Sequence, residues 1–130
     1  MRPGTGSATI YCMRPTTVLI VDDHEAFRES VSALLEADGF AIVGEAADGA
    51  DAIAETERLR PDVVLLDIQL PDQDGFAVAE RLAARPQAPA IVFISSRDAT
   101  AYGPRLEAAT ARGFIAKRDL SGAALADLVC

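Results

Sequence analysis

Five polar side chains each stand directly after a short apolar run. They are Asp22 and Asp23 after residues 18–21, Asp67 after residues 63–66, Ser95 after residues 90–94 and Lys117 after residues 114–116. Carboxylates brought close together repel one another unless one is protonated or a cation lies between them. A ligand set made only of oxygen atoms favours Mg²⁺ or Mn²⁺. With such a cation beside it, Asp67 could act as a nucleophile toward a phosphoryl group, whose oxygens Lys117 and Ser95 would hold.

The spacing of apolar residues predicts the elements that would bring these side chains together. Strands are expected at residues 18–21, 41–43, 63–66, 90–94 and 114–116, and each is followed by a helical pattern. Strands joined by helices lie parallel, with right-handed crossovers and helices on both faces of the sheet. We therefore predict an α/β fold of the flavodoxin-like (βα)5 type, a three-layer sandwich whose parallel five-stranded sheet has the order 2-1-3-4-5. In that order the first and third strands are neighbours, so their terminal carboxylates converge.

The predicted helices differ in how clearly the sequence marks them. The first carries Phe27, Val31, Leu34 and Leu35 on its inner face and ends at Gly39, and the second spans residues 50–59 with Ala50, Ile53, Ala54 and Leu59 facing inward. The third spans residues 75–84 with Phe76, Ala79, Leu82 and Ala83 facing inward, and the last spans residues 120–129 with Leu125 and Leu128. Between residues 97 and 112 the pattern is weak, and we expect that helix to begin at Pro104.

Length and composition restrict the class of protein. The chain has 130 residues, half of them hydrophobic, which suits one compact domain. Its formal net charge of −8 argues against direct nucleic-acid binding. The two cysteines, Cys12 and Cys130, indicate neither a disulfide framework nor a CxxC metal site, so a reducing cytoplasm is expected. No apolar run reaches membrane-spanning length, and no membrane association is expected.

The first residues differ in composition from the rest. Residues 1–15 are rich in Gly, Ser, Thr and Pro, and we expect a disordered tail there, followed by a single domain at residues 16–130. Met13-Arg14-Pro15 repeats Met1-Arg2-Pro3, so Met13 is an alternative start.

Taken together, the motifs resemble those of one protein family. They are Asp22-Asp23, Asp67 with Pro71 and Asp74-Gly75 behind it, Ser95, and Lys117 three residues after Phe114. In this order and spacing the chain resembles the receiver (CheY-like) domain of bacterial two-component response regulators over about residues 16–129. Asp-Asp-His at 22–24 and Arg-Gly-Phe-Ile-Ala-Lys at 112–117 resemble receivers that precede a helix-turn-helix DNA-binding domain, the branch with LuxR-type output. Since no such domain follows, we expect a stand-alone or truncated response regulator.

The resemblance implies how the site would work. Asp67 would take a phosphoryl group from a phosphohistidine on a sensor histidine kinase or phosphotransfer protein. Asp23, Asp67 and the backbone carbonyl of Gln69 would bind Mg²⁺ directly, and Asp22 would act mainly through water. Ser95 and Lys117 would hold the phosphoryl oxygens. The chain would then be a phosphoacceptor that assists its own phosphorylation and dephosphorylation, and not an enzyme.

The resemblance also implies a switch. Ser95 would move toward the phosphoryl group and Phe114 would turn inward, which changes the surface of the fourth helix, fifth strand and fifth helix. The resemblance leaves open whether the chain forms a homodimer through that surface, and it does not identify the downstream target. Phe114 lacks the hydroxyl of a tyrosine, and Arg118 stands where many receivers have a cis proline, so a trans peptide bond is expected there.

Several alternatives stay open. By sequence Ser96 is as plausible a hydroxyl as Ser95, although position favours Ser95. His24 is expected to lie near the site as a surface residue and not as a metal ligand, and Asp74 is expected to cap a helix.

Rival functions are also considered. A flavodoxin-type cofactor binder would need a Ser/Thr/Gly-rich loop after the first strand, and an aspartate-nucleophile phosphatase would need Asp-x-Asp there. The remaining rival is a degenerate receiver that acts as an unphosphorylated protein-interaction module.

Overall fold

In the computed structural model, residues 15–130 are described, and residues 1–14 of the predicted tail, Met13 among them, lie outside that range. Five parallel strands form one sheet in the order β2-β1-β3-β4-β5, as predicted. The strands are β1 (Thr17–Val21), β2 (Ala41–Ala46), β3 (Val63–Asp67), β4 (Ala90–Ser95) and β5 (Gly113–Ala116). The helices are α1 (Glu25–Ala37), α2 (Gly49–Leu59), α3 (Gly75–Ala83), α4 (Pro104–Ala108) and α5 (Gly122–Val129), with 3-10 turns η2 (Ala99–Ala101) and η3 (Lys117–Asp119).

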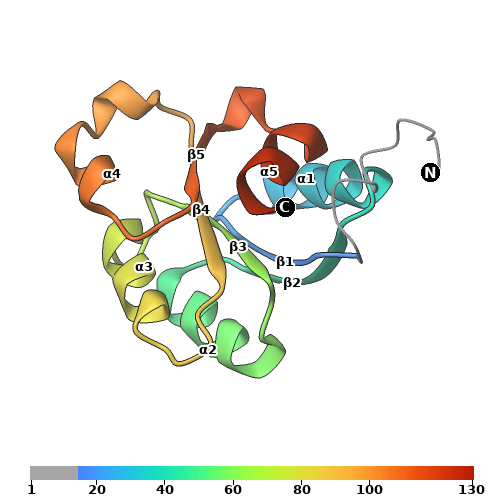
Figure 1. Ribbon diagram of the computed structural model, residues 1–130, viewed down its shortest axis with the longest axis horizontal. Coiled ribbons are helices and arrows are strands. Elements are labelled where there is room, and N and C mark those ends of the chain that lie inside the picture. The colour runs from blue at the N-terminus through green and yellow to red at the C-terminus, as the bar shows by residue number, and fades with distance from the viewer. Residues whose placement is uncertain (1–14) are drawn as a thin grey trace.

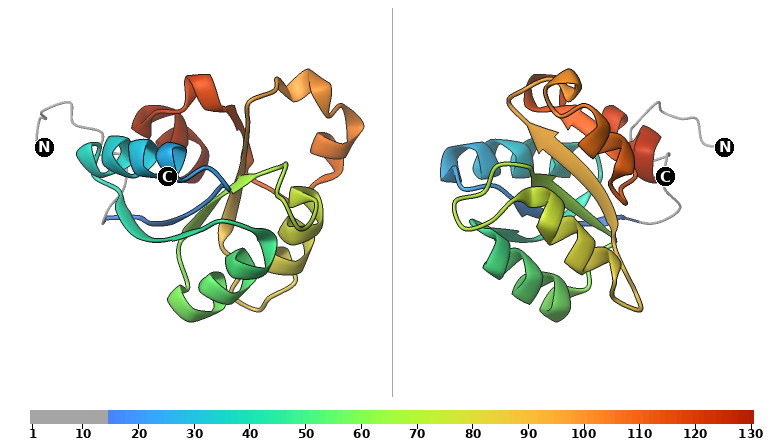
Figure 2. Two further views of the ribbon diagram at one scale, coloured as in Figure 1. Left: turned by 180° about the vertical axis from the view of Figure 1, so that it is seen from behind. Right: turned by 90° about the vertical axis from the view of Figure 1, so that its left-hand side faces the viewer.

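Helices cover both faces of the sheet, so the fold has three layers (Figure 1, Figure 2). Successive residues of a strand point to opposite faces. In β1, Val18 and Ile20 accordingly pack with α1 and α5, whereas Leu19 and Val21 pack with α2 and α3. β3 is buried along its whole length, as expected for a central strand. No helix within residues 15–130 is both long enough and apolar enough to cross a membrane.

The inner face of α2 differs in part from the prediction, because Ile53 and Leu59 pack against the core as predicted, whereas two of the predicted alanines do not. Ala52 and Thr56 are its buried side chains, whereas Ala50 and Ala54 are exposed. The hydroxyl of Thr56 donates to the carbonyl of Ala52 at 2.7 Å, and this bond allows a polar residue to be buried. Alanines occur on both the buried and the exposed side of this helix, so the apolar pattern alone does not identify the buried face.

Several element boundaries also differ from the prediction. Leu34 of α1 is 41% exposed, because the buried stripe runs through Val31 and Leu35, four residues apart. β2 extends to Ala46, because this edge strand is only partly buried and does not show as an apolar run. The last helix begins at Gly122 and not at residue 120. The fourth helix begins at Pro104, as predicted.

The start of α3 touches the end of β3 at Gly75. Its N–H donates to the carbonyl of Ile68 at 2.8 Å. A Cβ on Gly75 would lie 2.5 Å from the carbonyl oxygen of Asp67 and 2.6 Å from the Cα of Ile68. Both of these neighbours are backbone atoms, so a side chain at this position cannot be accommodated by a change of rotamer. Gly75 therefore lets the helix begin in direct contact with the residue that carries the central carboxylate.

We expect Gly75→Ala to lower the free energy of unfolding by about 2 kcal/mol, because the backbone between β3 and α3 must shift. Denaturant unfolding followed by circular dichroism measures the change. Ala77→Ser, an exposed position on the same helix, is the control and should stay within about 0.5 kcal/mol of wild type. Equal unfolding midpoints for the two variants would contradict the steric argument.

Candidate functional site

The sheet brings the predicted site residues to one edge. Asp22 directly follows β1, Asp67 ends β3, Ser95 ends β4 and Lys117 directly follows β5. Since β1 pairs with β3, β3 with β4 and β4 with β5, these residues form a row at the carboxyl ends of the strands. Open α/β sheets bind their ligands at this edge.

Lys117 connects the two buried carboxylates of this row. Its Nζ forms ion pairs with Oδ2 of Asp22 and with Oδ2 of Asp67, the latter at 3.2 Å. The side chain of Asp22 is fully buried, that of Asp67 is 6% exposed and that of Lys117 is 17% exposed. The same Nζ lies 4.5 Å from the centroid of the Phe27 ring, which α1 places over it. A buried charge is costly unless it is paired, so each of these three charges depends on the others.

Burial affects the three charged groups differently. It raises the pKa of Asp67 from 3.8 to about 6, and the hydrogen bond from the N–H of Gln69 and the charge of Lys117 offset only part of this effect. Burial also disfavours the Asp22 carboxylate, but hydrogen bonds from Lys117 and from the N–H of His24 outweigh it, and the pKa of Asp22 is lowered. For Lys117 the paired carboxylates outweigh burial and raise the pKa of the ammonium group. At pH 7 two carboxylates therefore face one ammonium group, and the net negative charge favours a cation.

Asp23 and His24 lie on the solvent side of this cluster. Nδ1 of His24 is 3.1 Å from Oδ1 of Asp23 and 3.2 Å from Oδ1 of Asp22. One ligand atom from each of the three residues lies within 4.8 Å of the others. The side chain of His24 is 71% exposed, which agrees with the expected surface position near the site. Asp22 thus points inward to Lys117, whereas Asp23 is exposed to solvent.

The loop after β3 shapes the other side of the site. The N–H of Gln69 donates to Oδ1 of Asp67 at 3.1 Å, which orients the carboxylate. Gln69 and Asp74 form an isolated antiparallel bridge that closes the loop. Oδ1 of Asp74 accepts from the N–H of Phe76 at 2.8 Å, so Asp74 caps α3 as expected. A metal-binding role for the carbonyl of Gln69 stays a prediction.

The residues present fit a hard divalent cation. Within residues 15–130, the buried Oδ2 of Asp22 has no hydrogen-bond partner besides its ion pair with Lys117. The carboxylates of Asp22, Asp23 and Asp67 offer oxygen ligands only, which suits Mg²⁺ or Mn²⁺.

Ser95 and Ser96, which the sequence leaves as alternatives, differ in burial. Ser95 is 1% exposed, whereas Ser96 is exposed. Oγ of Ser95 accepts from the N–H of Arg97 at 3.0 Å and lies 2.6 Å from the hydroxyl oxygen of Tyr102. Tyr102 is a site residue that sequence reasoning misses, because it lies in the segment with the weakest helical pattern and no motif marks it.

Phe114 is half-buried on β5 and packs against the core on the α2 and α3 side. Its ring centroid lies 6.2 Å from that of Tyr102. The Lys117–Arg118 peptide bond is trans, as expected, like the other peptide bonds of residues 15–130.

Arg28 of α1 is a second residue that the sequence does not mark. Its Nη1 donates to the backbone carbonyl of Asp22 at 2.7 Å, and its Nε donates to Oε1 of Glu45 at 2.8 Å. Arg28 therefore fixes the turn that carries Asp22 to the neighbouring strand β2.

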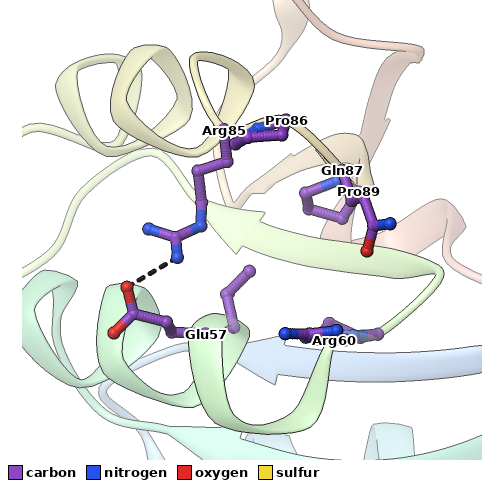
Figure 3. Close-up of a pocket in the computed structure, with 8 residues that line it drawn as sticks. Glu57, Arg60, Arg85, Pro86, Gln87 and Pro89 are labelled. Atoms are coloured by element: carbon purple, nitrogen blue, oxygen red, sulfur yellow. Dashed lines mark hydrogen bonds and ion pairs between the residues drawn. The ribbon is translucent and has the colours of Figure 1, made fainter.

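A separate cavity of about 260 Å³ lies at the opposite edge of the sheet. It is formed by the end of α2 and the loop between α3 and β4, where Arg85 pairs with Glu57 at 2.6 Å beside Arg60 (Figure 3). Pro61, which precedes β3, also lines it, so the cavity is at the amino end of the strand that carries Asp67 at its carboxyl end.

Comparison with known proteins agrees with this geometry. The family model for the response regulator receiver domain matches residues 18–127. The structure is similar to the signal receiver domain of NarL from Mycobacterium tuberculosis, with a TM-score of 0.80 and 32% identity, covering 88% of this chain and 95% of that one. It is also similar to a LuxR-family two-component response regulator from Aurantimonas sp. SI85-9A1, with a TM-score of 0.73 and 29% identity over 79% and 74% of the two chains.

Among curated proteins, the DNA-binding transcriptional activator EvgA of Escherichia coli K12 is 31% identical over 78% of this chain and 50% of its own length. This chain spans half or less of the length of the first curated relatives that it matches.

The raised pKa of Asp67 predicts a pH-dependent stability difference. Between pH 4 and pH 6 the folded chain keeps a proton on Asp67 that the unfolded chain has lost, so the free energy of unfolding falls as the pH rises through this range. At about 1.4 kcal/mol per pKa unit, the loss approaches about 3 kcal/mol. Asp67→Asn lacks this titration. The free energy of unfolding of the variant should therefore rise relative to that of wild type as the pH increases from 4 to 7.

Urea unfolding at several pH values with a metal chelator present measures this difference. Asp127→Asn, which changes an exposed aspartate, should stay within about 0.5 kcal/mol of wild type throughout. An Asp67→Asn difference that does not change between pH 4 and pH 7 would show that burial does not destabilise this carboxylate.

Proposed function

Because the chain belongs to the response regulator receiver domain family, we propose that Asp67 accepts a phosphoryl group, in the cytoplasm, from a sensor histidine kinase or phosphotransfer protein. The observation that carries the proposal is the double ion pair of Lys117 with the buried carboxylates of Asp22 and Asp67. This arrangement keeps an ionised carboxylate and a cation together at the carboxyl edge of the sheet. Phosphoryl transfer requires mainly positioning and charge neutralisation, and both are available there.

In the proposed transfer, an Oδ atom of Asp67 attacks the phosphorus of a phosphohistidine. The P–O bond to Asp67 forms while the P–N bond breaks, and the bonding electron pair leaves with the imidazole nitrogen, which then takes up a proton. The hydrogen bond from Gln69 to Oδ1 holds the carboxylate in one orientation during the attack. Lys117 lies within reach of the oxygens that gain negative charge.

The proposed cation is Mg²⁺, held by the carboxylates of Asp23 and Asp67 and the carbonyl of Gln69, with Asp22 acting mainly through water. When bound, it would neutralise the negative charge of the phosphoryl oxygens. The exposed position of Asp23 supports its role as a direct ligand, because its carboxylate is open to a cation from solvent, whereas the side chain of Asp22 is fully buried.

The proposed output is a change in the surface formed by α4, β5 and α5, through Ser95 and Phe114. A cavity of about 480 Å³ on the β5 and α5 side of this surface is lined by Phe114, Arg118 and Leu128, among others. Relatives such as EvgA are DNA-binding by name, but the net charge of −8 of this chain favours a protein as its direct partner.

We expect the wild-type protein to gain the mass of one phosphoryl group when it is incubated with Mg²⁺ and a small acyl phosphate. Asp67→Asn should gain none, because an amide is not nucleophilic enough to replace the carboxylate that forms the acyl phosphate bond. Intact-mass spectrometry measures the product, and Asp127→Asn, which should react like wild type, is the matched control.

Phosphorylation of a folded Asp67→Asn variant would contradict the assignment of Asp67. No mass gain in wild type under any condition would instead favour the degenerate receiver that acts as an unphosphorylated interaction module.

Mg²⁺ should stabilise the folded protein through Asp23. At a concentration of about ten times the dissociation constant, a ligand that binds only the folded state adds about 1.4 kcal/mol to the free energy of unfolding. Asp23→Asn should lose this increment, whereas Glu25→Gln, which removes an exposed charge two residues away, should keep it. Thermal unfolding with and without Mg²⁺ measures the effect, and equal losses in both variants would show that only general charge attraction is involved.

A further inference from the structure

The segment between β4 and β5 is held to the domain by few contacts. Neither η2 nor α4 contributes a buried residue. Tyr102 and Leu106 contact the core as partly buried side chains, and Arg105 pairs with Asp74 at the surface. Gly103, between η2 and α4, has a φ of +53° and open space around it.

Tyr102 forms a polar contact between this segment and the buried site. Its hydroxyl oxygen lies 2.6 Å from Oγ of Ser95. The ring centroid of Tyr102 is 5.8 Å from that of Phe76 and 6.2 Å from that of Phe114, so the ring is held between α3 and β5. On another side, Tyr102 borders a cavity of about 330 Å³ that Gln69 and other residues of the loop after β3 also line.

We propose that Tyr102 is a positioning residue that orients the hydroxyl of Ser95 toward the phosphoryl group, an inference that rests on the proposed function. A serine oxygen carries one proton and two acceptor sites. One acceptor site is taken by the N–H of Arg97. When Tyr102 donates to the second, the only proton of Ser95 is left for a phosphoryl oxygen.

The same contact couples the site to the segment that carries α4. Any movement of Ser95 toward a phosphoryl group lengthens or redirects its bond to Tyr102, whose ring packs against Phe114. Phe114 has no hydroxyl and cannot form a hydrogen bond with Ser95. Tyr102, which lies on a different element, forms that hydrogen bond instead. The segment can respond because nothing in it is fully buried and Gly103 allows its backbone to turn.

A double-mutant cycle tests the positioning role. Tyr102→Phe removes the hydroxyl and keeps the ring, so it should slow phosphorylation by a small acyl phosphate about fivefold, the effect of losing one neutral hydrogen bond. In a Ser95→Ala background, Tyr102→Phe should have no further effect, because there is no hydroxyl left to orient. An equal slowing in both backgrounds would overturn the proposal, because Tyr102 would then act only through packing.

Tyrosine emission gives a second measurement that does not require phosphorylation. The chain has two tyrosines and no tryptophan, so a Tyr11→Phe variant has Tyr102 as its only emitter. In that background Ser95→Ala should change the emission intensity of Tyr102 in the unphosphorylated protein, and phosphorylation should change it when Ser95 is present. Emission that responds neither to Ser95→Ala nor to phosphorylation would overturn the proposed link.

The two measurements separate the failure of this inference from failure of the proposed function. If the Tyr11→Phe protein gains no phosphoryl mass, the phosphoacceptor assignment fails, while its emission still tests the bond between Tyr102 and Ser95. If it gains the mass but the cycle is additive, only the role of Tyr102 is wrong.

Discussion

The site depends on one interaction, the ion pairing of Lys117 with two buried carboxylates. Asp22 and Asp67 follow neighbouring strands, and without a cation between them their mutual repulsion and desolvation would favour protonation. Lys117 reaches both from a third strand, and the ring of Phe27 covers its ammonium group. The remaining negative charge favours a cation at the site. The rest of the fold holds these three charges within contact of one another.

The parallel sheet meets this requirement through register and close backbone packing. Every strand ends at the same edge, so residues that are 22 to 95 positions apart in sequence become neighbours. Gly75 lets α3 begin against the backbone of Asp67, and Arg28 fixes the carbonyl of Asp22 to α1. The charged groups themselves contribute little net stability once desolvation is included. The site is therefore held in place by the apolar layers on both faces of the sheet and not by its own ion pairs.

The two sides of the site are held with different rigidity. Asp22, Asp67 and Lys117 lie on strands or directly after them, where neighbouring backbone fixes them. Ser95 is buried as well, but its partner Tyr102 belongs to a segment without a fully buried residue. One hydrogen bond thus joins the rigid cluster to a segment without a fully buried residue. Such an arrangement is compatible with the receiver domain family to which the chain belongs.

The sequence by itself determined where the strands lie along the chain, which polar residues end them, the cap at Asp74 and the start of α4 at Pro104, because these follow from local apolar runs and local turn chemistry. The strand order was predicted from the fold type that this alternation of strands and helices favours. Only the tertiary structure decided that Asp22 faces inward and Asp23 outward, that Ser95 is buried and Ser96 is not, and that Ala52 and Thr56 are the fully buried side chains of α2. Adjacent residues of similar type are distinguished only by what packs against them. The contact of Tyr102 with Ser95 has the same origin, since it joins a weakly patterned segment to a strand end through packing that no local spacing records.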